Sequence, residues 1–162
     1  MTTISVGANE EKDISITKSG EYLIEIVGSG ASAKIIGVFD ARKDNAVDIK
    51  LTIVHKAPHT RAKTILKGVA RDASSVRFFG LIKIEKNCGD TQSFLEERVL
   101  LLSDKAKAEA IPELEILSDD VKCSHAASIS QIPKEHLFYL ESRGIPKAQA
   151  ENMIVEGFLE IP

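Results

Sequence analysis

Short apolar segments recur along the chain from about residue 20 to residue 129, and Gly, Asp, Asn, Ser or Pro lies between most of them. The segments are rich in Ile, Val, Leu and Phe, which favour extended strands, and they are too brief for typical helices. We expect strands over residues 22–27, 34–39, 48–54, 64–69, 76–84, 94–102, 113–117 and 121–129. Before residue 20 the sequence shows one alternating segment, Asp13–Thr17, and otherwise predicts little.

The spacing of these segments indicates how the strands are connected. Their apolar centres fall near Ile36, Leu51, Ile65 and Phe79, about 14 or 15 residues apart. This spacing is long for a tight hairpin but fits one strand plus one corner of a coil that stacks on its neighbours. We therefore expect a mainly β protein with a parallel β-helix, or solenoid, in which each coil contributes two strands. An antiparallel sandwich, whose turns recur at shorter intervals, remains the alternative.

The pattern changes character after residue 132. Pro133 is suited to the first position of a helix, and residues 134–143 then carry apolar side chains at helical spacing. Gly144 is a plausible C-terminal cap, and Pro146 begins a second helical run over 147–156. This arrangement predicts a two-helix hairpin. The chain is thus divided into a β core, residues 1–131 with 1–19 unassigned, and a helical hairpin, residues 132–162.

Composition and charge narrow the classes of partner. The chain has 162 residues, of which 43% are hydrophobic and 28% charged, as in an ordinary globular domain. A net charge of -3 gives little attraction for nucleic acid or anionic lipid. The sequence has no apolar run long enough to span a membrane and no basic-then-apolar N-terminal signal. With only two cysteines, we expect reduced thiols and a cytoplasmic location.

The strongest candidate for chemistry is the pair Cys123 and His125. Two residues apart on a strand, their side chains project from the same face. Thiolate and imidazole are soft and borderline ligands that suit iron if the thiolate is exposed. A buried Cys that merely packs is the alternative. We expect Cys88 at a coil corner, where an incidental thiol is the favoured interpretation.

The other histidines favour structural roles. His55 and His59 have the i, i+4 spacing of a helical metal pair, but Pro58 between them argues against a continuous helix. We expect both to lie at a coil corner. His136, at the start of the first expected helix, is interpreted as a surface residue.

Two further classes of function are less consistent with the sequence. The carboxylate pairs Asp119–Asp120 and Glu113–Glu115 are consistent with a carbohydrate-active β-helix enzyme. The chain, however, has no Trp and only two Tyr, so it has few aromatic side chains on which a sugar could stack. The terminal hairpin invites a DNA-reading motif, yet its second helix offers only Lys147 as a base. The sequence also lacks a phosphate-binding Gly-x-x-x-x-Gly-Lys loop, so we expect no nucleotide hydrolysis by this chain.

Several motifs, taken in order, resemble one known family. They are His55-Lys-Ala-Pro-His-Thr60, Lys67-Gly-Val69, Gly80-Leu-Ile-Lys-Ile-Glu-Lys86, the run from Leu100 to His125, Leu137-Phe-Tyr139, Ser142-Arg-Gly-Ile145 and Ile154-Val-Glu-Gly-Phe-Leu159. They span residues 55–159, about two-thirds of the chain, and are similar to the SufB/SufD scaffold proteins of iron–sulfur cluster assembly. The resemblance implies a right-handed parallel β-helix followed by helices.

The family also implies partners and a site. Its helical region docks on a SufC-like ABC-type ATPase, its β-helices pair with a second scaffold, and cluster building is associated with the interface between them. In the SufD-like branch a Lys-Cys-Ser-His run contributes a histidine, which here is His125 of Lys122–His125. The SufB-like branch has a glutamate directly after that histidine, whereas this chain has Ala126, so it is SufD-like at this point.

The chain also departs from the family pattern. It is much shorter than typical members, and the usual Tyr-Gln-x-x-Arg motif is replaced by Phe94-Leu-Glu-Glu-Arg98. These departures bear on whether the chain assembles a cluster by itself more than on its fold.

These observations lead to one expected function and one alternative. We expect a non-enzymatic, SufD-like scaffold or accessory subunit that forms a homodimer or pairs with a second scaffold. Its only cofactor would be a transient cluster shared across the dimer at Cys123 and His125. The expected ATPase-facing residues are Leu137, Phe138, Arg143 and Ile145. The alternative for the hairpin is that its apolar residues cap the open end of the solenoid. The alternative for the whole chain is a truncated structural scaffold that dimerises without a cluster.

Overall fold

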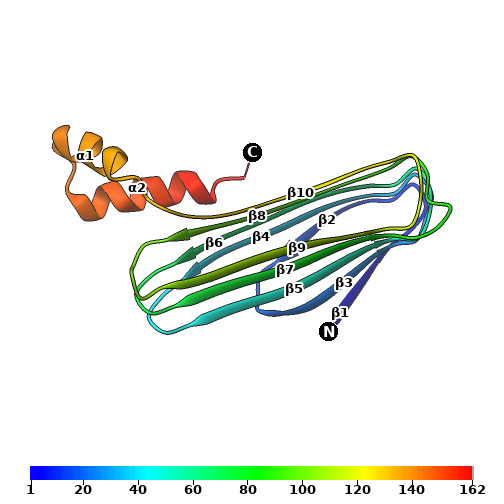
Figure 1. The fold of residues 1–162 in the computed structure, drawn as a ribbon, viewed down its shortest axis with the longest axis horizontal. Coiled ribbons are helices and arrows are strands. Elements are labelled where there is room, and N and C mark those ends of the chain that lie inside the picture. The colour runs from blue at the N-terminus through cyan, green and yellow to red at the C-terminus, as the bar shows by residue number, and fades with distance from the viewer. Residues whose placement is uncertain (162) are drawn as a thin grey trace.

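The chain folds as an elongated, flattened solenoid followed by two helices (Figure 1). The computed structural model describes residues 1–161. Its strands are β1 (Thr2–Val6), β2 (Glu11–Ile16), β3 (Gly20–Ile26), β4 (Ser32–Ala41), β5 (Ala46–His55), β6 (Arg61–Ala70), β7 (Ser75–Ile84), β8 (Thr91–Leu101), β9 (Lys107–Ile116) and β10 (Val121–Gln131). The helices are α1 (Lys134–Ser142) and α2 (Lys147–Leu159).

Strands alternate between two sheets as the chain advances. Sheet A has the order β1-β3-β5-β7-β9 and sheet B the order β10-β8-β6-β4-β2, with parallel pairing throughout. In sheet A, Ile49 of β5 lies beside Phe78 of β7, and Phe78 lies beside Ala110 of β9. Each strand therefore pairs with the next strand but one along the chain, and two strands with their corners make one coil. The expected solenoid is confirmed, and the antiparallel sandwich is excluded.

Alternation along each strand builds the core between the sheets. In β4, the buried positions Ala33, Ile35, Phe39 and Ala41 alternate with more exposed ones. The inward residues of facing strands meet, so that the rings of Phe39 and Phe78 lie 6.0 Å apart between centroids. Each inward residue also stacks on the residue in register with it in the next coil, so the inward positions form columns of side chains that run from coil to coil. The core is therefore continuous along the solenoid.

The structure adds strands where the sequence predicted little. Both β1 and β2 precede residue 17, and Val6, Ile14 and Ile16 are buried in the core. Strand β9 begins at Lys107, well before the expected start at residue 113, and it contains Pro112. Pro112 is tolerated because β9 is an edge strand that pairs only with β7, which leaves its missing N–H on a free side.

The two expected helices are present, but they do not cover the end of the solenoid. Val155 of α2 packs against Val69 and Leu100, which lie on the outer face of sheet B. Lys67 fixes the same end of α2 by donating a 2.6 Å hydrogen bond to the carbonyl of Glu160. The alternative in which the hairpin caps the solenoid is therefore wrong, since the hairpin lies beside the coils. Neither helix within residues 1–161 has the length and apolar character that a bilayer-spanning segment requires.

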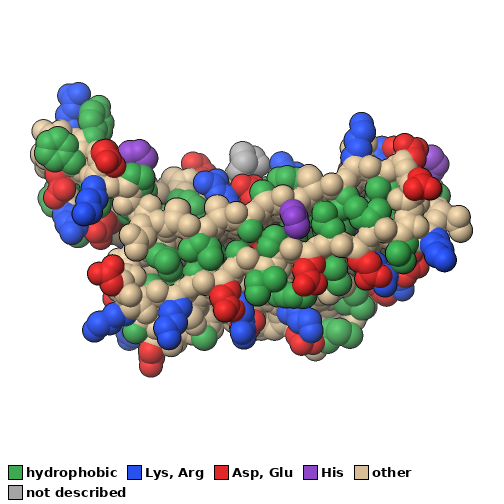
Figure 2. Space-filling model, in the orientation of Figure 1, with side chains coloured by type: hydrophobic (Ala, Val, Ile, Leu, Met, Phe, Trp, Pro, Cys, Tyr) green, Lys and Arg blue, Asp and Glu red, His purple; other side chains and the backbone are tan. Residues whose placement is uncertain are grey.

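The last coil, made of β9 and β10, is consequently left uncovered. We call its inner side the open end; it carries Leu114 and Ile116 of β9 and His125 and Ile129 of β10. Leu114 is 37% exposed, Ile116 42% and Ile129 46%, although they extend columns that are buried in earlier coils. Figure 2 shows hydrophobic side chains, in green, exposed along the molecule between the strands of this coil.

Candidate functional site

Cys123 and His125 lie on the same face of β10, as their spacing predicts, and the structure shows that this face points inward. Cys123 lies in register with Ser93 of β8, and His125 lies in register with Leu95. Ser93 and Leu95 are buried inward residues, so the two β10 side chains stack on the same column positions. Since no further strand covers β10 in the described chain, His125 is exposed and Cys123 is half-buried. The pair therefore lies within the open end.

The thiol is not activated in the isolated chain. Burial raises the pKa of Cys123, because the interior disfavours the charged thiolate. Iron binds the thiolate, so binding to Cys123 must displace a proton. Iron binding at Cys123 was expected only if the thiolate is exposed. The side chain is half-buried, so the isolated chain meets this condition only in part.

Cys88 lies at the predicted corner, in the turn between β7 and β8, but it is buried. The residue is 1% exposed, and its Sγ lies 3.5 Å from the carbonyl oxygen of His55. Burial is the main cause that raises the pKa of this thiol. Cys88 therefore packs the corner between two coils, in keeping with a structural role.

His55 is the centre of a buried polar network. Its Nδ1 lies 2.8 Å from Thr60 Oγ1 and its Nε2 lies 3.0 Å from Ser93 Oγ. Thr60 donates its hydroxyl proton to the carbonyl of Ala57, so it accepts from His55. This assigns the proton of the ring to Nδ1 and makes Ser93 the donor to Nε2. Burial lowers the pKa of His55 to about 4, which keeps the ring neutral.

His59 diverges from His55, as the structural interpretation requires. Its backbone has a left-handed φ of 60°, and its Nδ1 lies 3.0 Å from a carboxylate oxygen of Asp90. His59 thus fastens one corner to the corner of the next coil. The two histidines are not a metal pair.

A buried carboxylate that the sequence did not single out lies one coil below β10. Glu97 of β8 is fully buried, and neither of its carboxylate oxygens has a hydrogen-bond partner. Burial raises its pKa from 4.5 to about 7. Its side chain reaches toward Gly80 of β7, where an added Cβ would lie 2.5 Å from Oε1 of Glu97. Alternation with Leu95 would have assigned Glu97 to the inside, but the adjacent Glu96 made that choice ambiguous.

The two acidic pairs lie in different parts of the last coil, Glu113 and Glu115 on β9 and Asp119 and Asp120 in the turn before β10. Glu115 projects outward from β9 and forms a 2.8 Å ion pair with Lys83. Asp120 lies in the turn before β10 with a left-handed φ of 54°. These carboxylates serve as parts of charge ladders and turns, which is their usual role on a sheet.

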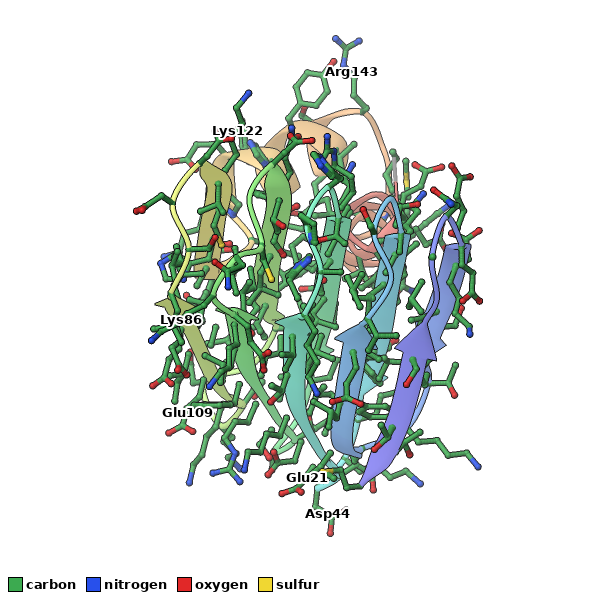
Figure 3. The ribbon with its side chains drawn as sticks, turned by 90° about the vertical axis from the view of Figure 1, so that its right-hand side faces the viewer. Glu21, Asp44, Lys86, Glu109, Lys122 and Arg143 are labelled. Carbon is green, nitrogen blue, oxygen red and sulfur yellow. The ribbon has the colours of Figure 1, made fainter. Side chains whose placement is uncertain are left out.

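Charges on the two outer faces differ in arrangement. On sheet A, Arg77 lies between Asp48 and Glu109 in neighbouring coils and contacts both. On sheet B, Lys34 and Lys63 are in register with each other, and neither has an ion-pair partner in the described chain. They line a groove that continues to Lys122. Figure 3 shows Lys122 and Arg143 on one side of the molecule and Glu21, Asp44 and Glu109 on the opposite side.

The expected partner-binding residues of the hairpin are only partly exposed. Phe138 is 73% exposed, whereas Leu137 and Ile145 are half-buried. Arg143 is exposed and its guanidinium lies 5.2 Å from the ring centroid of Tyr139, which is itself 57% exposed. Helix α1 has no buried residue. The sequence therefore missed Tyr139, which joins Phe138 and Arg143 in one surface.

The donor set fits iron in kind but not in number. Thiolate and imidazole are ligands that iron accepts, yet a cluster takes about four protein ligands. Among residues 1–161, no three His, Cys, Asp or Glu side chains lie close enough together to hold a metal ion. One copy in this conformation therefore offers an incomplete site.

These features define a class of protein: a two-sheet parallel solenoid with a thiol and an imidazole on its uncovered last coil and a helical hairpin beside it. Residues 15–158 match the family model of the SUF system FeS cluster assembly, SufBD core domain. The chain belongs to the SufBD family.

Named relatives agree with this assignment. The chain is 31% identical over 135 residues to the iron–sulfur cluster assembly SufBD family protein of Staphylococcus saprophyticus. It is 30% identical over 135 residues to the family proteins of Staphylococcus epidermidis and Staphylococcus haemolyticus. Each match covers 83% of this chain and 29% of the relative. The chain thus matches less than a third of the length of these relatives.

Proposed function

We propose that this protein is a scaffold or accessory subunit of Suf-type iron–sulfur cluster assembly, in which the cluster is cargo. Family membership supports a role in cluster assembly. The observation that carries the more specific proposal is the placement of Cys123 and His125 on the uncovered coil, beside apolar side chains that an isolated chain leaves exposed.

Pairing of two scaffolds supplies what one chain lacks. The open end presents the free backbone edges of β9 and β10 together with Leu114, Ile116 and Ile129. Unpaired edges and contiguous apolar side chains are features that proteins cover with a partner. Two copies that meet here bring two thiols and two imidazoles together, which matches the ligand number of a cluster. Apolar cover also lowers water access to the bound iron.

The hairpin is the proposed contact for an ABC-type ATPase. Its surface of Phe138, Tyr139 and Arg143 combines two exposed aromatic rings with a stacked guanidinium, residue types that dominate protein interfaces. Leu137 and Ile145 are half-buried residues of the same hairpin. Because α2 is packed on β6 and β8, a movement of the hairpin is mechanically linked to sheet B. Nucleotide hydrolysis in the ATPase would in this way change the arrangement of two scaffolds.

In this proposal the chain catalyses no reaction by itself. The Cys123 thiol gives up its proton to bind iron, and His125 donates a ring nitrogen to the same assembly. The neutral His55 network holds Ser93 directly beneath Cys123. The stacking of Cys123 on Ser93 positions β10 relative to β8. The neutral ring of His55 places no positive charge near the Cys123 thiol.

Anaerobic reconstitution tests the site. The protein is mixed with ferrous iron and sulfide, desalted, and measured for retained iron, sulfide and visible absorption. We expect retained sulfide and cluster absorption in the wild type and their loss in Cys123→Ser and His125→Ala. His136→Ala is the matched control, because His136 is an exposed histidine on α1. Equal sulfide retention and cluster absorption in all four proteins would contradict the site. Co-purification with the cognate ATPase, weakened by Phe138→Ala, tests the hairpin contact.

The alternative is a structural scaffold that pairs without carrying a cluster. The raised pKa of the half-buried Cys123 favours it, since such a thiol resists deprotonation. This alternative predicts a dimer in solution with no retained iron. The reconstitution experiment therefore distinguishes the two functions when the solution mass is measured alongside it.

A further inference from the structure

Two adjacent glutamates on β8 have opposite environments. Glu96 faces outward and is half-buried near Arg98, whereas Glu97 faces inward and is completely buried. Both oxygens of Glu97 lack a hydrogen-bond partner, and the remaining unpartnered buried side-chain atom of the described chain is Oγ1 of Thr64. A carboxyl group that is buried without a partner costs free energy that an apolar side chain of the same size would not. Packing alone does not explain Glu97.

Room for the carboxyl group is built into the opposite sheet. Gly80 faces Glu97 from β7, and a Cβ at that position would overlap both Oε1 of Glu97 and Cδ2 of Leu95, each at 2.5 Å. Any other residue at position 80 would displace the carboxyl group. The core is thus shaped around a polar group that finds no partner inside the chain.

The open end lies only one coil away from Glu97. In register above Glu97 is Ala127 of β10, and in register above Gly80 is Pro112 of β9. Neither residue has a long side chain to fill the last coil at this level. Turning the carboxylate from Gly80 toward the inner side of β10 requires a change of the Glu97 side-chain torsions.

The nearest metal-binding side chain on that inner side is His125. It precedes Ala127 by two residues, so the Cα atoms of His125 and Glu97 are separated by about 4.8 Å across strands and about 6.6 Å along them, or about 8 Å in all. Long side chains on diagonal positions reach each other over this distance. One metal ion bound at about 2.0–2.2 Å to each ligand atom bridges such a pair.

We propose that Glu97 and His125 together bind a divalent iron ion inside the last coil, which makes Glu97 an additional ligand of the cluster-building site. The inference rests on the proposed function. A carboxylate oxygen and an imidazole nitrogen form a donor pair that iron(II) accepts. The bound cation supplies the positive partner that the buried carboxylate lacks.

Cys123 is too far from Glu97 to bind the same metal ion. It lies four residues before Ala127, about 13 Å along the strand, and on the other side of His125. The thiolate and the carboxylate therefore reach different metal ions, with His125 between them. Loss of Cys123 is expected to leave the Glu97–His125 ion in place.

Cobalt(II) is a suitable probe because its absorption reports the ligands. The whole protein is titrated anaerobically with Co²⁺ by calorimetry and absorption, in wild type, Glu97→Gln, His125→Ala and Cys123→Ser. Glu96→Gln is the matched control, one residue away on the outer face. We expect Glu97→Gln and His125→Ala each to weaken the tightest Co²⁺ site by about tenfold or more, a size typical of lost support at metal sites. Glu96→Gln and Cys123→Ser should leave this site unchanged, although Cys123→Ser removes any sulfur-to-cobalt absorption.

The outcomes separate this inference from the proposed function. If Glu97→Gln binds Co²⁺ as tightly as wild type while Cys123→Ser and His125→Ala lose the reconstituted cluster, the Glu97 inference is overturned and the scaffold function stands. If none of the variants changes metal binding, both are overturned. Glu97→Gln removes a buried ionisable group, so its folding is expected to be intact, and circular dichroism verifies this.

Discussion

Replacing Glu97 with Gln should stabilise the metal-free protein in a manner that depends on pH. Burial raises the pKa of Glu97 from 4.5 to about 7, so the folded state holds the proton more tightly than the unfolded state. The stability associated with the protonated carboxyl group is therefore fully present below about pH 4.5 and is lost as the pH rises through 7. Gln does not titrate and loses nothing over this range.

The size of the effect follows from the two pKa values. A rise from 4.5 to about 7 corresponds to about 3 kcal/mol, since each pKa unit is worth about 1.36 kcal/mol. For a chain of this size, about 1 kcal/mol moves the melting temperature by about 2–4 °C. The melting temperature of Glu97→Gln minus that of wild type should thus be about 6–12 °C larger at pH 8 than at pH 4.5. The buried amide carries its own cost, which does not vary with pH.

Thermal unfolding followed by circular dichroism at pH 4.5, 6 and 8 measures this difference. His55 has the opposite dependence, because its pKa is lowered to about 4 and its contribution is lost as the pH falls from 6.5 toward 4. It is present in both proteins, so it cancels from their difference. Glu96→Gln, one residue away on the outer face of the same strand, serves as the matched control. A Glu97→Gln difference that is constant from pH 4.5 to 8 would refute the reasoning.

Three further predictions concern the fold. Gly80→Ala should lower the free energy of unfolding in urea by about 1–3 kcal/mol through overpacking, whereas Gly89→Ala, where an added Cβ meets nothing within 4 Å, should not; equal effects would contradict the close approach of Glu97. His55→Ala should destabilise the protein at pH 7 and remove part of the stability loss between pH 6.5 and 4, and an unchanged acid profile would argue against a neutral buried ring. Val155→Asp should release the hairpin from sheet B, seen as faster proteolysis near residue 132 with the sheet signal retained; unchanged proteolysis would contradict that packing.

The sequence predicted the solenoid because spacing and alternation are local signals. Ile36 and Ile65 are in register in the structure, as the regular spacing of the apolar centres implies. Leu51 and Phe79 are displaced by one position, so Leu51 faces the core and Phe79 faces outward. Such one-residue shifts in register depend on the number of residues in each corner, which varies from coil to coil. The composition of the chain does not reveal these numbers.

Other features depend on contacts between distant segments. The burial of His55 depends on Ser93, which is 38 residues away in sequence. Helix α2 docks on Val69 and Leu100. Leu100 lies in a run of apolar residues, and only the pairing of β8 with β6 shows which of them face outward. That Cys123 and His125 share one face of β10 was predictable, because alternation along a strand is local. The incomplete burial of this pair followed only from the absence of a covering strand beyond β10 in the described chain.

The most direct test of the central claim is native mass spectrometry of the anaerobically reconstituted protein. Cys123 and His125 lie on a coil that the chain leaves open, and the account predicts iron and sulfide on a species that contains two protein chains. Cys123→Ser and His125→Ala should lose the sulfide-containing cluster from the two-chain species while remaining folded. Iron and sulfide carried equally by wild type and both variants, or bound only by single chains, would contradict it.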